Sequence, residues 1–283
     1  MVSSDDLGAL ALQAMLFEVS ATPKPGLVDR NNCGAHKDMD FFTFMSSAAA
    51  LRSSFDEFAN AGFMYSGELG HLLEVLRPIG IAAEQRMFKL TKGVNTHKGM
   101  IFSLGVLVAV AGYLKGYGEQ LTKDKLCDAV AVVCHDITKR DYAKLKDKAE
   151  LTKGEAMYLK YGVTGVRGEL EKGFPSVRTI SLPIYEKLCE KGYSVNDALV
   201  GALLALLAEA GDTNVLGRHD METLEYVKRS AKNVLKVGGV ETELGRKMLL
   251  QLDNDFIVRY ISPGGSADLI AITYFIYEVT KTS

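Results

Sequence analysis

Five segments of the chain combine glycines, carboxylates and basic side chains next to an expected helix start. They are TPKPGLVDRNNCGAHKDMD (22–40), TKGVNTHKG (91–99), YGVTGVRGELEKGFPSVR (161–178), GDTNVLGR (211–218) and SPGGSADL (262–269). Glycines let a backbone approach a phosphate closely, and the unpaired N–H groups of a helix start attract anions. None of the segments has a Walker or Rossmann glycine pattern in its required context, so each alone is weak evidence. Together they predict a site for phosphate-bearing ligands.

The segment NTHKG places four polar side chains, Asn95, Thr96, His97 and Lys98, before an apolar run at 100–114. That run is apolar around its whole circumference and predicts a buried helix. Asn95 and Thr96 could cap this helix themselves. Because Lys98 adds a point charge, we favour a phosphate site at this helix start, with all four residues as candidates.

Carboxylates in these segments could hold a metal or stabilise positive charge on a ribose. Asp38 and Asp40 precede an expected helix, and either could be its N-cap. Two acids beside His36 exceed what capping needs, so a metal or ribose role is favoured. Asp212 could cap a turn or contact metal or substrate, with equal weight. Asp268 falls in the first turn of the last helix, where an acid is favourable in any case, and it is a further candidate for substrate binding. Oxygen ligands suit Mg²⁺, which we expect at Asp38, Asp40 and Asp212.

Other polar residues in the segments are candidates for substrate contact. Arg167 and Glu169 could form a surface ion pair, although a phosphate contact by Arg167 and a catalytic role for Glu169 are favoured. Lys24 lies between two prolines, which restrict its freedom. The remaining candidates for substrate or phosphate binding are Asp29, Asn32, Thr213, Asn214, Arg218 and Ser266.

Composition limits the classes of partner. The 283 residues carry a formal net charge of -2 and are 47% hydrophobic, so no global basic surface for nucleic acid or an anionic membrane is expected. The first residues lack a basic leader, and the longest apolar runs fall short of the ~20 residues that span a bilayer. Four scattered cysteines form no CxxC pair. We expect a cytoplasmic protein with reduced thiols; a homodimer is a further expectation.

The segments must be positioned by helices, because the rest of the chain has helical periodicity and no hairpin or strand signal. The pattern predicts one all-α domain over 1–283 with roughly ten helices and functional loops at helix N-termini. Thr152 and Glu155 form a capping-box pair, and Pro78 predicts a kink or break. The expected helices are 3–21, 40–60, 66–90, 98–116, 122–139, 152–161, 175–191, 195–210, 220–237, 241–256 and 266–280.

Six segments, in this order, resemble the signature segments of the triphosphoribosyl-dephospho-CoA synthase family. They are KPGLVDRNNCGAHKDMD, NTHKG, YGVTGVRGE, GFPSV, GDTNV and SPGGSADL, and they extend from about Thr22 to Leu269. Six matches in order are far more specific than any single glycine pattern. This chain departs from the family at Met100, where a smaller residue is common, and after Leu216.

The resemblance implies a ribosyl transfer. Members of the family join ATP to 3'-dephospho-CoA, place the 5-triphosphoribosyl group on the 2'-hydroxyl and release adenine. A transferase then attaches the product to an acyl carrier protein of citrate lyase or malonate decarboxylase. A carboxylate would stabilise the oxocarbenium-like ribose, a general base would activate the hydroxyl, and Mg²⁺ would bind the phosphates. The candidates for the catalytic steps are His36, Asp38, Asp40, Glu169 and Asp212.

Two other classes of function stay open on the sequence. A Mg²⁺-dependent hydrolase of nucleotides or ADP-ribose could use the same acid-rich loops on an all-α fold. A non-catalytic helical binding module is the third possibility, although it would not need so many acids and amides in its loops.

Overall fold

Helices form all the regular structure in the part of the chain that the computed structural model describes, which is residues 4–143, 145 and 151–281. The α-helices are α1 (Ser4–Ser20), α2 (Phe41–Phe63), α3 (Leu72–Leu90), α4 (Lys98–Gly116), α5 (Lys123–Val133), α6 (Ile137–Tyr142), α7 (Lys153–Tyr161), α8 (Gly165–Glu171), α9 (Leu182–Glu190), α10 (Val195–Glu209), α11 (Thr213–Arg218), α12 (Met221–Lys236), α13 (Glu243–Val258) and α14 (Gly264–Lys281). Short turns η1 (Leu69–His71), η3 (Val177–Ser181) and η4 (Gly239–Glu241) complete the set. The all-α prediction is confirmed. Residue 3, where the first helix was expected to begin, lies outside the described residues.

The apolar helix α4 lies in the middle of the core, packed against α1, α2, α3 and α14. Glycines let α2 and α4 touch along their backbones: a Cβ added at Gly62 would lie 1.8 Å from the Ala109 carbonyl oxygen. One added at Gly112 would lie 2.3 Å from that of Ala59. One hydrophobic cluster includes buried residues from α1 through α14, as a single domain requires.

By length and composition alone, α4 would be able to cross a membrane. The sequence had predicted that its apolar run is too short to do so. Most of it is buried inside the protein, however, and core helices pass the same test. Its burial on all sides therefore accounts for its apolar sequence.

Local signals explain most helix boundaries and several errors in the predicted ones. Thr152 and Glu155 make the expected capping box. The range 122–139 is two helices, because Asp136 adopts a left-handed backbone with φ 56° between α5 and α6. The break expected near Pro78 comes earlier, at η1, and Pro78 lies inside α3. The short helices α8 and α11 occupy segments that were expected to be loops.

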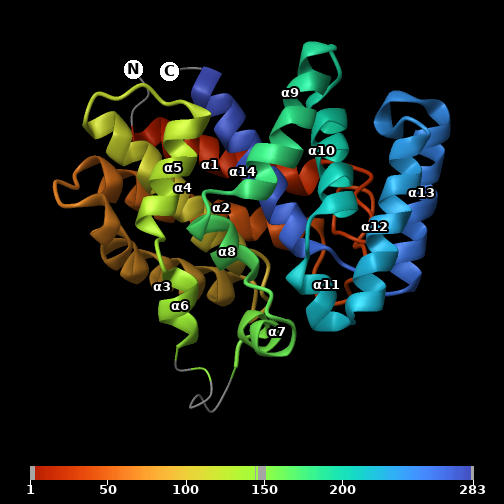
Figure 1. Ribbon diagram of the computed structural model, residues 1–283, viewed down its shortest axis with the longest axis horizontal. Coiled ribbons are helices and arrows are strands. Elements are labelled where there is room, and N and C mark those ends of the chain that lie inside the picture. Colours follow the sequence, from red (N-terminus) through yellow and green to blue (C-terminus); the bar gives the residue numbers. More distant parts are fainter. Residues whose placement is uncertain (1–3, 144, 146–150, 282–283) are drawn as a thin grey trace.

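Figure 1 shows how the elements surround the site. The helices α12 and α13 form an outer pair at one end of the molecule (Figure 1), and α1 packs against α14. Near the middle, α4 contacts α8 and α14, while α11 contacts α7 and α14. The first turns of α4, α11 and α14 are thereby brought to one region.

Candidate active site

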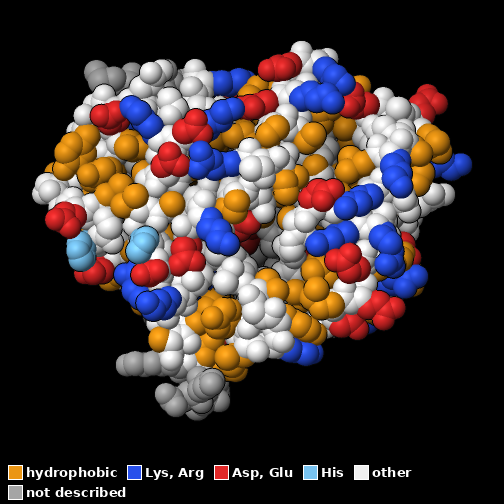
Figure 2. Space-filling model, viewed as in Figure 1, with side chains coloured by type: hydrophobic (Ala, Val, Ile, Leu, Met, Phe, Trp, Pro, Cys, Tyr) orange, Lys and Arg blue, Asp and Glu red, His pale blue; other side chains and the backbone are white. Residues whose placement is uncertain are grey.

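A cleft of about 940 Å³ opens where these helix starts meet, and all five polar segments line it. Figure 2 shows a hollow near the centre of one face, with basic side chains beside it. One wall comes from the end of α1, from α2, α3 and the start of α4. The other comes from α7, α8, the start of α11 and the start of α14. The structure therefore gathers the predicted segments into one site.

The long connection before α2 is folded by its own polar residues. Asp29 accepts hydrogen bonds from the backbone N–H groups of Asn31 (2.7 Å), Asn32 (3.1 Å) and Lys24 (3.1 Å). The Asn32 side chain donates to Asp253 of α13 (2.9 Å) and accepts from the Gly34 N–H. Asp29 and Asn32, which were expected to bind substrate, thus shape the loop and lie away from the cleft lining.

This folding carries Lys24 into the interior, where its ammonium group forms an ion pair with Glu18 at the end of α1. Both side chains are almost fully buried, and both line the cleft. Burial raises the pKa of Glu18, and the Lys24 charge opposes that rise. Such a pair loses hydration on burial, which its mutual attraction must offset. A buried ion pair at the wall of a polar cleft is a feature of a ligand site rather than of a core.

At the start of α4, three side chains form a hydrogen-bond chain. The Thr96 hydroxyl donates to Ser47 Oγ of α2 (2.7 Å), and Ser47 Oγ lies 2.8 Å from His97 Nδ1. His97 lines the cleft but is only 1% exposed, and its Nε2 atom is buried without a partner among the described residues. Burial, together with the Lys24 charge, lowers the pKa of His97 to about 3, so the ring is neutral. The imidazole is therefore held in place with one nitrogen free for a ligand.

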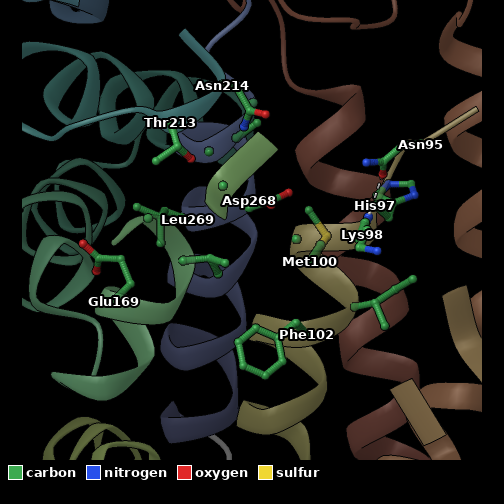
Figure 3. Close-up of a pocket in the computed structure, with 18 of the residues that line it drawn as sticks. Asn95, His97, Lys98, Met100, Phe102, Glu169, Thr213, Asn214, Asp268 and Leu269 are labelled. Atoms are coloured by element: carbon green, nitrogen blue, oxygen red, sulfur yellow. Dashed lines mark hydrogen bonds between the residues drawn. The ribbon is translucent and has the colours of Figure 1, made fainter. Parts of the chain in front are cut away.

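The same helix start is also partly self-capped. Asn95 Oδ1 accepts a hydrogen bond from the Lys98 N–H (3.1 Å). The Lys98 ammonium lies 2.8 Å from Glu84 of α3, and both residues line the cleft. Figure 3 shows Asn95, His97 and Lys98 on one side of the cleft, with Thr213 and Asn214 on the other. The capping and ligand-binding interpretations are thus compatible at this site.

The three acids expected to share a metal ion are not brought together. Asp40 is the exposed N-cap of α2 and accepts from the Thr43 N–H (2.8 Å), and its contacts with Thr43 lower its pKa. Asp38 is exposed, 3.7 Å from His36 Nδ1. No group of three or more His, Cys, Asp or Glu side chains in the described residues is placed to hold a metal ion. An acid that caps a helix and an acid that binds metal look alike in a sequence, which explains why a metal site was expected where the structure shows a helix cap.

Asp212, the third of these acids, connects two helix starts. Its Oδ1 accepts from the N–H groups of Asn214 (2.8 Å) and Val215 (3.2 Å) at the start of α11. Its Oδ2 accepts from the Ser266 N–H (2.8 Å) and hydroxyl (2.9 Å) at the start of α14. Burial raises its pKa, and these bonds oppose the rise. Asp212 and Ser266 therefore position the cleft wall, while Thr213 and Asn214 line it.

On α8, Arg167 and Glu169 line the cleft but do not pair with each other. Arg167 Nε donates to Asp141 (2.8 Å), which also binds Arg77 (2.9 Å). Glu169 accepts from the Ser176 hydroxyl (2.6 Å) and N–H (3.2 Å), and burial raises its pKa. Arg77 and Arg167 share the Asp141 carboxylate and form a basic edge of the cleft. Arg167 therefore pairs with Asp141 and not with Glu169, as the surface-pair alternative would require.

His36 joins the first segment to the other wall. Its Nε2 lies 2.8 Å from Ser262 Oγ, and its Nδ1 lies 3.4 Å from Arg218 at the end of α11. Both His36 and Arg218 line the cleft. These contacts link the start of the chain to α11 and α14 across the site.

The sequence did not point to four acidic or basic residues that line the cleft, Glu18, Arg77, Glu84 and Asp141, nor to Ser47, which contacts His97 behind the lining. All lie on helices rather than in the glycine-rich segments. Glu18 had a usable signal, since an acid in the last turn of a helix opposes the helix dipole and calls for another partner. The others look like ordinary helix residues until the fold places them.

Asp268, for which a helix-dipole role was the simpler interpretation, projects into the space between α14 and the start of α4 (Figure 3). Burial is the main cause that raises its pKa well above the usual value for an aspartate. The charges of Glu18 and Asp212 add to the rise, and that of Lys24 opposes it. The cleft therefore contains a carboxylate of unusual basicity together with several cations and the starts of three helices.

Comparison with known proteins shows to which family the chain belongs. The model of the ATP:dephospho-CoA triphosphoribosyl transferase family matches residues 4–283. A probable 2-(5''-triphosphoribosyl)-3'-dephosphocoenzyme-A synthase of Pectobacterium carotovorum is 44% identical over 98% of this chain and 90% of its own length. The synthases of Escherichia fergusonii and Klebsiella pneumoniae are each 40% identical, over 99% and 97% of this chain and 93% and 91% of their own lengths. No solved structure matches. The chain belongs to the ATP:dephospho-CoA triphosphoribosyl transferase family.

Proposed function

We propose that this protein transfers the 5-triphosphoribosyl group of ATP to the 2'-hydroxyl of 3'-dephospho-CoA and releases adenine. The observation that carries the proposal is the family match over residues 4–283, together with relatives of that activity at 40–44% identity over nearly the whole chain. The hydrolase and binding-module alternatives find no support in these comparisons.

The chemistry of the cleft supports the same reaction. Two phosphate-rich substrates need cations, and Lys98, Arg77 and Arg167 lie along the cleft edge with the start of α4. The transfer also needs a carboxylate close to the reacting atoms, and Asp268 is the half-buried acid between α4 and α14. The volume lies near the upper end of the usual range for ligand sites, ~300–1,000 Å³, as two large substrates require.

Mg²⁺ is part of the proposal as a companion of ATP. The cleft contains single acids and no three-residue cluster, so phosphate oxygens would provide most of the ligands and the protein at most one or two. Bound in this way, the ion would neutralise the triphosphate charge. Asp38, Asp40 and Asp212 are not needed for this arrangement.

The partners follow from the reaction. The product would pass to a transferase that attaches it to an acyl carrier protein. A cytoplasmic location, a homodimer and the lack of nucleic-acid or membrane partners stay predictions from the sequence.

The deciding experiment is incubation of the protein with Mg²⁺, ATP and 3'-dephospho-CoA, followed by mass analysis of the products. We expect adenine and a triphosphoribosyl adduct of dephospho-CoA in equal amounts, and no adenine without the acceptor. Full CoA should be a poor acceptor, because its 3'-phosphate crowds and charges the neighbouring hydroxyl. Adenine release without an acceptor, or equal turnover of CoA, would contradict the proposal.

A further inference from the structure

One acid in the cleft has no structural partner. Six acidic side chains line the cleft: Glu18, Glu84, Asp141, Glu155, Glu169 and Asp268. The first five are engaged, by Lys24, by Lys98, by two arginines, by the Thr152 N–H and by Ser176, respectively. Within the described residues, no hydrogen bond or ion pair engages Asp268. A half-buried carboxylate without a partner is costly to the fold, which points to a partner supplied by the ligand.

The chain makes room for this carboxylate at Gly99, the last residue of the NTHKG segment. A Cβ added at Gly99 would lie 2.3 Å from Asp268 Oδ2, closer than side-chain carbons come to any atom. A glycine inside the first turn of a helix costs about 1 kcal/mol relative to alanine. The glycine therefore permits the acid to lie against the start of α4, where Figure 3 shows it facing the open cleft.

The surroundings of Asp268 favour a base over a permanently charged group. Glu18, Asp212, Lys24 and His97 are the titratable groups near it on α1, α11, the first loop and α4. Burial and the first two charges raise its pKa well above normal, against the Lys24 charge. A general base is most effective when its pKa is near the working pH.

His97, whose Nε2 also has no partner among the described residues, is excluded as this base by the hydrogen bond of its Nδ1. Thr96 donates to Ser47, so the Ser47 hydroxyl proton is available to His97 Nδ1. The single proton of the neutral ring then resides on Nε2, the buried nitrogen that has no partner among the described residues. A protonated Nε2 can donate a hydrogen bond but cannot accept a proton.

We propose that Asp268 is the catalytic base that takes the proton of the acceptor 2'-hydroxyl, with Gly99 as the position that sets its carboxylate. This inference rests on the proposed function. The hydroxyl proton moves to an Asp268 oxygen, and the released electron pair forms the bond from the 2'-oxygen to C1 of the ribose. The C1–N9 bond breaks, and its electron pair leaves with adenine. Adenine takes one proton, and Asp268 returns one to solvent, so no other reactant is required.

The first test replaces Asp268 by its uncharged isostere. Asp268→Asn should lower kcat by roughly 10²–10⁴-fold, because proton transfer by a positioned base contributes about that much. Its affinity for ATP should stay within about threefold. A plot of the wild-type kcat/KM against pH should rise through the Asp268 pKa. This rise should be missing from the same plot for Asp268→Asn. Asp220→Asn is the matched control, because Asp220 is an exposed N-cap of α12 outside the cleft.

The second test moves the carboxylate without removing it. Gly99→Ala should force Asp268 to shift by roughly 1 Å, a displacement that can cost about 10²-fold in rate. Alanine favours a helix, so the melting temperature should not fall. Gly70→Ala is the control, because the nearest atom to its added Cβ is 4.0 Å away. Formate should restore part of the activity to Asp268→Ala by acting as a base in the vacated space.

The outcomes separate this inference from the proposed function. If the wild type releases adenine only with dephospho-CoA and Asp268→Asn is as fast, the function stands and the base is another group. The assignment of Asp268 as the base would also be overturned if Asp268→Asn is slow but keeps the wild-type rise of kcat/KM with pH, and formate restores no activity to Asp268→Ala. Without acceptor-dependent adenine release in the wild type, both the function and the base would be rejected.

Discussion

At the scale of single residues, burial decides which polar groups of the cleft carry charge. Lys24 and Glu18 form a buried ion pair, whereas His97 is neutral because burial lowers its pKa to about 3. A sequence shows that these residues exist but not how deeply they lie. The helix start at 95–98, where a phosphate site was expected, consequently has a neutral imidazole beside one cation, Lys98.

The neutral state of His97 predicts a pH-dependent stability. Its folded pKa of about 3 lies below the unfolded value of about 6.5, so the unfolded chain binds a proton that the folded protein does not. Stability is therefore lost as the pH falls below 6.5, by about 2 kcal/mol between pH 8 and pH 5. Urea unfolding should show this loss in the wild type and not in His97→Gln. If the free energy of unfolding falls equally with pH in the two proteins, His97 is protonated in the folded protein.

Lys98 predicts a selective loss of phosphate binding. Lys98→Ala removes a charge-assisted contact worth ~1.5–3 kcal/mol, so ATP affinity should fall roughly ten- to hundredfold. Adenosine, which lacks the triphosphate, should bind as before. Lys123→Ala is a matched control, because Lys123 also faces an acid, Glu186, but lies outside the cleft. Calorimetry with both ligands measures the effect, and an unchanged ATP affinity would make Lys98 a partner of Glu84 alone.

At the scale of elements, the long amphipathic or apolar helices were predictable and the short ones were not. The range 98–116 matches α4 at both ends, because a polar segment precedes a long apolar run. The helices α8 and α11 have only 7 and 6 residues and begin within glycine-containing segments. Such helices are too short for periodicity to be seen, and they are stabilised by packing against α5, α7 and α14 instead. The sequence therefore predicted where the site segments lie but not their conformation.

Asp40 illustrates the same difficulty and gives a test. As the N-cap of α2, it should tolerate Asp40→Asn, because asparagine caps about as well. Asp40→Ala should lower the free energy of unfolding by about 1 kcal/mol without changing the rate of the reaction. Chemical denaturation and a magnesium titration of activity measure the two effects. A rate loss in Asp40→Asn, or a higher magnesium demand, would return Asp40 to the active site.

At the scale of the whole molecule, the cleft depends on segments more than 200 residues apart. Asp253 of α13 accepts from the Gly26 N–H (2.9 Å), and His36 Nε2 lies 2.8 Å from Ser262 Oγ. These contacts place Lys24 and Asp268 in one cavity, although neither lies near the other in sequence. The order of the segments revealed a family and hence a shared site, whereas the roles of the individual acids required the fold.

A single large cleft also predicts the kinetic order of the reaction. A second cavity in the described part of the chain is a shallow depression on α1, far smaller and lined by no predicted site residue. ATP and dephospho-CoA must therefore occupy the main cleft together, and transfer should be direct. Initial rates measured while varying both substrates should give intersecting lines in double-reciprocal plots. Lys98→Ala should keep this pattern while raising the KM for ATP. Parallel lines, together with adenine release before the acceptor is added, would instead indicate a covalent ribosyl-enzyme and a carboxylate that acts as nucleophile.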